Sequence, residues 1–309
     1  MGKHSSVAFR AGDYYSPRFW PMWCTIGLLR AISLLPFRGQ IAVGKLLGDL
    51  IYLCGARRKR IVDINLARCF PDKSEAERNR IKRECFQNFG ISLVELAMCW
   101  WWPPEKLELI VEIEGREHLQ RVLDDGRGAI LLTGHFGSLE IGARLLALYT
   151  PLQVMYRTQR NPLFDSYLYT RRSNYFVNTV SRKKTRKLIK GLKQHIPTWY
   201  APDQDFRRER NVFAPFMGIA TATITASARL ARSSGAAMLP YYPERKRDGS
   251  GYLLRIDPPL ADFPSEDDFR DASAINASIE KYARRFPENY MWIHQRFKTR
   301  PPGEAPFYS

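Results

Sequence analysis

A histidine and a glutamate stand close together within residues 128–140, GAILLTGHFGSLE. His135 follows a short apolar run that ends at Gly134, and Glu140 comes five positions later. A carboxylate that accepts the proton of one imidazole nitrogen fixes the tautomer and leaves the other nitrogen free as a general base. The pair could therefore activate a nucleophile that a substrate supplies. The alternative is a histidine satisfied near the core, beside a glutamate in a first helical turn.

The elements around this pair decide whether the two side chains can meet. Residues 129–133 have the length of a buried strand, and residues 141–149 have a helical apolar pattern that Ser138 could cap. His135 is thereby placed at the carboxyl end of a strand, where open α/β sheets hold their sites. Five positions along a regular helix rotate a side chain by about 140°. Contact therefore requires that the motif straddle the turn.

A basic block lies further along the chain. Nine Lys and Arg residues and no acidic residue occur between Arg171 and Lys193. The Arg171-Arg172 pair could hold a phosphate group in bidentate fashion. The lysine-rich helix expected at 183–193 could bind DNA, the acidic surface of a carrier protein or lipid headgroups, or it could simply be a solvated face.

Asp203 and Asp205 follow the apolar run 196–201, at another expected strand end. An Asp-x-Asp sequence there would suit a metal-dependent glycosyltransferase, although Pro-Asp more often forms a turn. We therefore predict no metal site. Walker, dinucleotide-binding and Gly-x-Ser-x-Gly motifs are absent from the sequence, which argues against ATP hydrolysis, NAD-dependent chemistry and serine hydrolysis.

The overall charge and the cysteines narrow the class of protein. The 309 residues include 48 Lys and Arg against 31 Asp and Glu, a formal charge of +17, so an anionic partner or surface is expected. Five cysteines with no close pair and few histidines argue against a disulfide framework or a zinc site. We expect an N-terminal anchor and lead-in over residues 1–56 and a single catalytic domain over residues 57–309.

Residues 19–37 are apolar apart from Arg30, and a weaker apolar run covers residues 41–55. Neither reaches the roughly 20 uncharged residues of a clear membrane span, and no signal-peptide cleavage site follows. We interpret them as a retained membrane anchor, either a single span or interfacial. Aromatic residues before the first run and the basic cluster 57–60 after the second would suit a bilayer surface. A pair of ordinary core helices is the alternative.

Runs near 109–113, 129–133, 152–156, 196–200, 236–242 and 252–256 predict strands, with helices between several of them. Residues 74–102 predict a long helix that opens with a capping box and ends in three tryptophans, which suit either core packing or a bilayer interface. A tail with little structure is expected after residue 298. The predicted fold is α/β: a mixed, mostly parallel sheet flanked by helices on both faces, preceded by the hydrophobic helical anchor.

Several segments together resemble the bacterial lipid A biosynthesis late acyltransferases over nearly the whole chain. The matching segments are residues 14–20, 65–66 with 69–71, 135–136 with 139–140, 156–157 with 161–162, 172–174, 199–205 (WYAPDQD) and 289–301 (NYMWIHQRFKTRP). Position 289 departs from this pattern, since many relatives carry Gln there, and we assign it no role. Glutamate at position 140, where the related glycerol-phosphate acyltransferases have aspartate, fits the lipid A branch.

The resemblance implies a glycerol-phosphate-acyltransferase-like fold and transfer of a medium-length acyl chain, lauroyl by expectation, from acyl-[acyl carrier protein]. The acceptor would be the hydroxyl of a 3-hydroxyacyl chain on a Kdo-lipid A precursor, at the cytoplasmic face of the inner membrane. His135 would be the general base and Glu140 its orienting partner, with no cofactor. Substrate contacts are expected from Arg157, Arg171, Arg172, Asn174, Asp203 and Asp205.

Within that implied role, Arg172 would lie at a phosphate or at the oxyanion, and the part played by Asp203 stays open. An acyltransferase that uses another membrane phospholipid or glycolipid acceptor is the nearest alternative. A basic nucleic-acid-binding protein at the membrane is the rival from another class, but it leaves residues 199–205 unexplained, and we expect no nucleic-acid partner.

Overall fold

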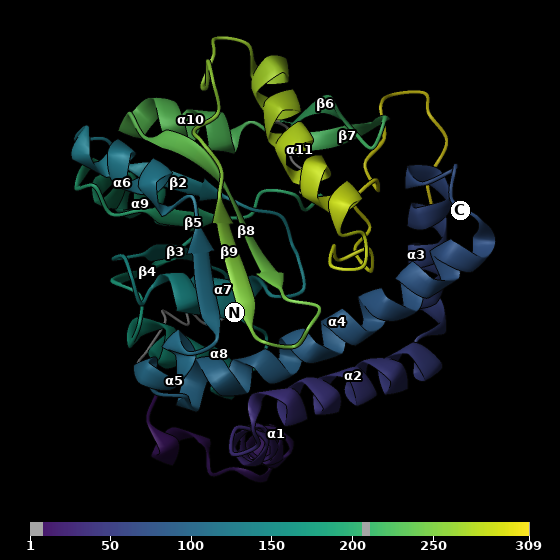
Figure 1. The fold of residues 1–309 in the computed structure, drawn as a ribbon, viewed down its shortest axis with the longest axis vertical. Coiled ribbons are helices and arrows are strands. Elements are labelled where there is room, and N and C mark those ends of the chain that lie inside the picture. Colours follow the sequence, from purple (N-terminus) through teal and green to yellow (C-terminus); the bar gives the residue numbers. More distant parts are fainter. Residues whose placement is uncertain (1–8, 206–210, 309) are drawn as a thin grey trace.

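A seven-stranded sheet lies at the centre of the computed structural model, which describes residues 9–205 and 211–308 (Figure 1). Its strand order is β1-β9-β8-β2-β5-β3-β4, and every neighbouring pair is parallel except β8 with β9. The strands are β1 (Val111–Glu114), β2 (Ala129–Leu132), β3 (Gln153–Tyr156), β4 (Asn178–Ser181), β5 (Thr198–Tyr200), β8 (Ala237–Arg245) and β9 (Tyr252–Ile256). The predicted mixed, mostly parallel α/β sheet is thus confirmed.

Helices cover both faces of this sheet, as predicted (Figure 1). They are α1 (Trp20–Ile32), α2 (Phe37–Cys54), α3 (Ala56–Cys69), α4 (Glu75–Trp101), α5 (Pro104–Glu108), α6 (Arg116–Asp124), α7 (Leu139–Leu146), α8 (Pro162–Ser173), α9 (Thr185–Lys193), α10 (Ala226–Ser234) and α11 (Asp268–Arg285). Short 3-10 turns, η1 (Ala11–Tyr14) and η2 (Pro17–Phe19), precede α1. A separate antiparallel hairpin, β6 (Asn211–Phe216) with β7 (Ile219–Ile224), packs against α11.

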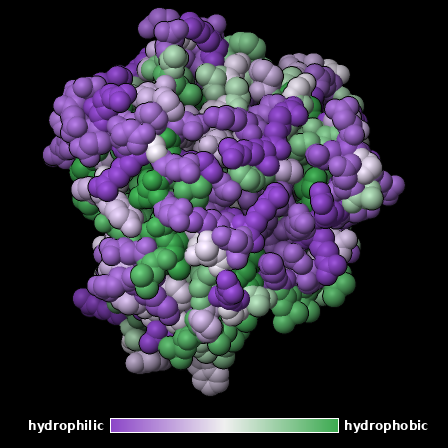
Figure 2. Space-filling view, in the orientation of Figure 1, coloured by the Kyte–Doolittle hydropathy of each residue, from purple (hydrophilic) through white to green (hydrophobic). Residues whose placement is uncertain are grey.

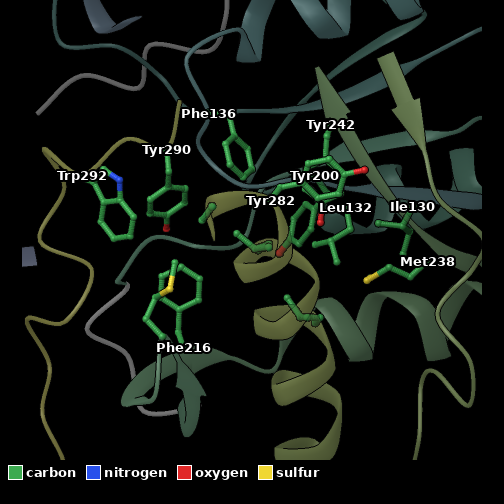
Figure 3. Close-up of a cluster of buried hydrophobic side chains, with 14 of the residues drawn as sticks. Ile130, Leu132, Phe136, Tyr200, Phe216, Met238, Tyr242, Tyr282, Tyr290 and Trp292 are labelled. Carbon is green, nitrogen blue, oxygen red and sulfur yellow. The ribbon is translucent and has the colours of Figure 1, made fainter. Parts of the chain in front are cut away.

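Alternate side chains of the fully buried strand β2 point into two different cores. Ile130 and Leu132 belong to the core that α9, α10 and α11 cover. Leu131 belongs to the second core, which α6, α7, α8 and α1 cover. Figure 3 shows part of the first core, where Phe136 lies beside Tyr290 and Tyr242, with ring centroids 5.4 and 5.7 Å away. The turn that carries His135 is therefore held by packing on its core side.

The long helix α4 confirms the prediction for residues 74–102 in detail. Ser74 accepts a hydrogen bond from the backbone N–H of Glu77, whose carboxylate in turn accepts the N–H of Ser74, which is the predicted capping box. At the other end Trp100 and Trp102 are buried, and the indole N–H of Trp102 donates to the carbonyl of Ser33 at 2.8 Å. These two tryptophans pack inside the protein, which is the first of the two roles that the sequence suggested, core packing or a bilayer interface.

The two N-terminal apolar runs form the separate helices α1 and α2. Among residues 9–205 and 211–308, no helix combines the length and the apolar composition needed to cross a bilayer. Instead, α2 lies along α4 (Figure 1), with backbone meeting backbone. A Cβ on Gly48 would come within 2.4 Å of the backbone of residues 86 and 87, and one on Gly90 within 2.3 Å of Gly44 and Gly48. This close approach accounts for the glycines at these positions.

The tail is more ordered than expected. The Tyr308 hydroxyl donates to Asn65 at 2.7 Å, and Phe307 and Tyr308 pack on the first core. Strand β4 and the hairpin β6–β7 were not predicted either.

Candidate active site

His135 lies just beyond the carboxyl end of β2, as predicted, and is bonded twice to one carboxylate. Its ring Nδ1 is 2.5 Å from Asp203 Oδ1, and its backbone N–H donates to Asp203 Oδ2 at 2.8 Å. Asp203 follows β5, which pairs with β2 in parallel register, Leu132 opposite Tyr200. Adjacent parallel strands end at the same edge of a sheet, so their two loops bring imidazole and carboxylate together.

Asp203 is 4% exposed, yet it remains a carboxylate. Burial alone would raise its pKa, but the charge of His135, the two hydrogen bonds from His135 and the charge of Arg296 together lower the pKa well below its ordinary range. An ionised Asp203 only accepts hydrogen bonds, so the proton of a neutral His135 ring must sit on Nδ1. The lone pair on Nε2, which has no hydrogen-bond partner within residues 9–205 and 211–308, can then accept a proton.

Glu140 does not orient His135, which corrects the arrangement expected from the motif. Its carboxylate accepts hydrogen bonds from Arg172 Nε at 2.8 Å, from a terminal nitrogen of Arg172, and from the Tyr175 hydroxyl at 3.1 Å. The reason is that Glu140 stands in the first turn of α7 and faces α8, whereas the imidazole faces β5. The motif does straddle the turn, but its two side chains have different partners.

The Glu140–Arg172 ion pair is largely buried, with side chains 13% and 14% exposed. Burial would lower the pKa of Arg172, but the charge and the hydrogen bonds of Glu140 outweigh it and raise the pKa above its ordinary value. Arg172 is therefore a fixed cation, and it lines the same cleft as His135.

This cleft has a volume of about 710 Å³. One part of its lining is apolar, with Leu139, Met155, Phe164 and Trp199. Besides Arg172, three further arginines line it, namely Arg157, Arg160 and Arg182, and none of these three forms an ion pair with an acidic residue in the described parts of the chain. A general base, an apolar wall and unpaired cations in one cleft suit an amphiphilic anionic substrate.

Of the six expected substrate-binding residues, only Arg157 and Arg172 are among the described residues that line the cleft, and Asp203 lies behind His135. Arg171 donates to the carbonyl of Trp100 and to the Tyr167 hydroxyl, and Asn174 stands at the C-terminal end of α8. Asp205 accepts the backbone N–H and the hydroxyl of Thr299 at 2.6 and 2.9 Å. Asp203 and Asp205 thus turn to different partners, and within the described residues no group of three or more His, Cys, Asp or Glu side chains could hold a metal ion.

The segment 289–297 lies directly on the His135 turn. The carbonyl of His135 accepts the N–H of Met291 at 2.9 Å, and Gly137 N–H donates to the carbonyl of Asn289 at 2.8 Å. His294 is brought beside His135, with ring centroids 5.6 Å apart, and its Nδ1 is 3.2 Å from Gln204 Nε2. His294, Gln204 and Arg160 were not predicted as site residues, and Arg182 was predicted only as part of the basic block 171–193. The match of residues 289–301 to the family pattern is the sequence feature that could have pointed to His294.

His294 gives a testable dependence of stability on pH. Burial first, and then the charge of His135, lower its pKa from 6.5 to about 4. Between these values the unfolded chain binds a proton that the folded protein does not, so the free energy of unfolding falls as pH decreases from 6.5 to 4. His294→Gln should lose this contribution, and the difference in unfolding free energy between wild type and variant should shrink with acidification. Urea unfolding at several pH values measures it, and parallel curves would contradict it.

Comparisons with known proteins show the family of this chain. The sequence profile of the family described as bacterial lipid A biosynthesis acyltransferase matches residues 10–299. The lipid A biosynthesis lauroyltransferase of Escherichia coli (strain K12) is 38% identical over 93% of this chain and 94% of its own. The palmitoleoyltransferase of the same strain is 37% identical over 96% and 97%, and the myristoyltransferase 30% identical over 96% and 92%.

Among solved structures, the 1-acyl-sn-glycerophosphate acyltransferase PlsC of Thermotoga maritima aligns with 82% of this chain and 99% of its own, at a TM-score of 0.38 and 15% identity. The family profile and the relatives do decide the family, since both extend over nearly the whole chain. The chain belongs to the bacterial lipid A biosynthesis acyltransferases.

Proposed function

We propose that this enzyme transfers a medium-length acyl chain, lauroyl in our proposal, from acyl-[acyl carrier protein] to the hydroxyl of a 3-hydroxyacyl chain on a Kdo-lipid A precursor. The observation that carries the proposal is the hydrogen bond between the buried Asp203 and His135. His135 lines a cleft that is also lined by apolar and arginine side chains. The described lining of that cleft includes neither Ser nor Cys. Direct attack by the acceptor hydroxyl is therefore the simplest chemistry.

In this mechanism His135 Nε2 takes the proton of the acceptor hydroxyl while the oxygen attacks the thioester carbonyl. Asp203 stabilises the imidazolium that forms. The tetrahedral intermediate then expels the thiolate of the donor, which takes the proton back from the imidazolium. An ester and a free thiol result, and the base is regenerated.

The cations of the cleft have a separate task. Arg157 and Arg160 would hold the phosphates of the acceptor, since arginine binds phosphate through charge-assisted hydrogen bonds. Arg172, fixed by Glu140, would lie at a phosphate or at the oxyanion. The apolar wall would take the acyl chain, and each buried methylene contributes about 0.8 kcal/mol.

The test is transfer by the purified enzyme to Kdo2-lipid IVA, measured by mass spectrometry, with lauroyl, palmitoleoyl and myristoyl carrier protein offered in competition. We expect one added acyl chain, and faster transfer of lauroyl than of the other two. Acylation of a phospholipid or another glycolipid, with no reaction of Kdo2-lipid IVA, would establish the alternative acceptor instead.

We further propose that the enzyme works at the cytoplasmic face of the inner membrane and binds it in an interfacial manner. Leu46, Leu50 and Leu53 of α2 are 62%, 52% and 70% exposed and form one helix face, here named the leucine face, opposite the glycines that meet α4. Leu28 and Leu34 nearby are also exposed, and the lower edge of Figure 2 shows hydrophobic residues there. Such a face suits insertion into the headgroup layer.

A single substitution tests this membrane binding. Leu50→Asp should weaken partition into anionic vesicles about tenfold or more, because the carboxylate would have to enter the apolar boundary. Phe269→Asp is the matched control: Phe269 is 51% exposed, against 52% for Leu50, and lies in the first turn of α11, far from α2 (Figure 1). Vesicle flotation of both variants measures the effect, and equal losses would contradict the proposal.

A further inference from the structure

Seven exposed cations gather on α9 and the turn before it. We name this surface the α9 patch: Arg182, Lys183, Lys184, Arg186, Lys187, Lys190 and Lys193. Among the described residues none of the seven has an acidic partner, whereas Arg232, Arg255 and Lys281 elsewhere on the surface do. Seven unpaired like charges on so short a segment repel one another, so the patch is complementary to a strongly acidic partner.

The rest of α9 fixes the direction in which these cations point. Leu188 and Leu192 are fully buried in the first core, and Gly191 lies so close to Gln153 that a Cβ there would approach its side-chain oxygen within 2.2 Å. The helix therefore cannot rotate without breaking this packing. Its charged side is held outward as a rigid surface.

The patch begins at the cleft. Arg182 lines the cleft together with His135, and α9 starts three residues later. A partner seated on the patch would thus lie next to the entrance through which a thioester must reach His135. A flexible arm from that partner could deliver its terminal group into the cleft.

The patch and the leucine face lie on different sides of the molecule. α9 packs on the core that contains Ile130 and Leu132, whereas α2, which carries the leucine face, lies along α4. Figure 1 places α9 at the upper left and α1 and α2 at the lower edge. A bilayer that takes up the leucine face would leave the α9 patch in water. The partner should therefore be a soluble macromolecule.

We propose that the α9 patch is the docking surface for the acidic protein that carries the acyl thioester. This inference rests on the proposed function, because it concerns the donor of that same reaction. A nucleic acid would also meet the charge requirement, but it would give no reason for the patch to adjoin the cleft. Electrostatic docking mainly changes the rate at which the two proteins associate. The effect should therefore depend on the salt concentration, and the rate of the chemical step should not change.

The double variant Lys187→Glu/Lys190→Glu tests the docking, because these two exposed residues share one side of α9 and do not line the cleft. With lauroyl carrier protein as donor, we expect KM to rise about tenfold at low salt with kcat retained. With lauroyl-pantetheine, which has the same thioester but no protein, kcat/KM should be unchanged. Arg121→Glu on α6, an exposed arginine with no ion pair among the described residues, is the control and should behave as wild type with both donors.

The outcomes separate the two proposals. Equal losses with both donors would overturn the docking surface and leave acyl transfer intact. Loss of vesicle or nucleic-acid binding, with an unchanged KM for the carrier protein, would assign the patch to lipid headgroups or nucleic acid and also overturn it. If wild type transfers lauroyl from neither donor, the proposed function itself fails.

Discussion

Asp203→Asn is expected to lower kcat by about 10³- to 10⁴-fold while the protein stays folded. Asp203 accepts two N–H groups of His135, one from the backbone and one from the ring. Asparagine has only one side-chain oxygen, so its NH2 group must face one of these donors. If the oxygen keeps the backbone N–H, the NH2 group turns to Nδ1 and forces the ring proton onto Nε2, where it blocks the base.

The control is Asp205→Asn in the same loop. Asp205 also accepts two hydrogen bonds, but both come from Thr299. Its replacement should weaken the attachment of the C-terminal segment and change kcat only a few-fold. Rates come from mass spectrometry of the acylated lipid, and folding from circular dichroism. Asp203→Asn with a kcat within tenfold of wild type would refute the role of Asp203.

His135→Ala should reduce kcat to a similar extent, and the double variant His135→Ala/Asp203→Asn should be no worse than His135→Ala alone. Residues that act as a unit give strongly non-additive losses, because removing the base leaves nothing for its partner to orient. Additive losses would mean that Asp203 acts on catalysis by a second route.

The sequence predicted His135 at a strand end and Asp203 at another, and both positions are confirmed. The sequence did not show that these two strand ends are neighbours. Along the chain, β3 and β4 come between β2 and β5, but in the sheet β2 is paired directly with β5. Strand order is a property of the whole sheet. From the sequence, the partner of His135 is therefore predicted five residues away, in Glu140, whereas the observed partner, Asp203, lies 68 residues away.

The missed strands have a local cause. β4 consists of Asn178, Thr179, Val180 and Ser181 at the edge of the sheet, and only Val180 is buried, so it lacks an apolar run. The N-terminal helices show the opposite limit. The apolar content of these helices does not reveal whether a given helix face contacts lipid or protein. In α2 the buried face is the one on which Gly44 and Gly48 contact Gly90 of α4.

Glu140→Ala is expected to lower the free energy of unfolding by about 3–5 kcal/mol, since it leaves the largely buried Arg172 without its carboxylate. Adding Arg172→Met should restore most of that stability without restoring transfer, because the cleft then lacks a fixed cation. Arg270→Ala, which breaks the exposed pair with Asp262, should cost less than about 1 kcal/mol. Urea unfolding and acyl transfer measured on the same samples distinguish this role from the orientation of His135, which would predict full stability in Glu140→Ala and a loss of kcat alone.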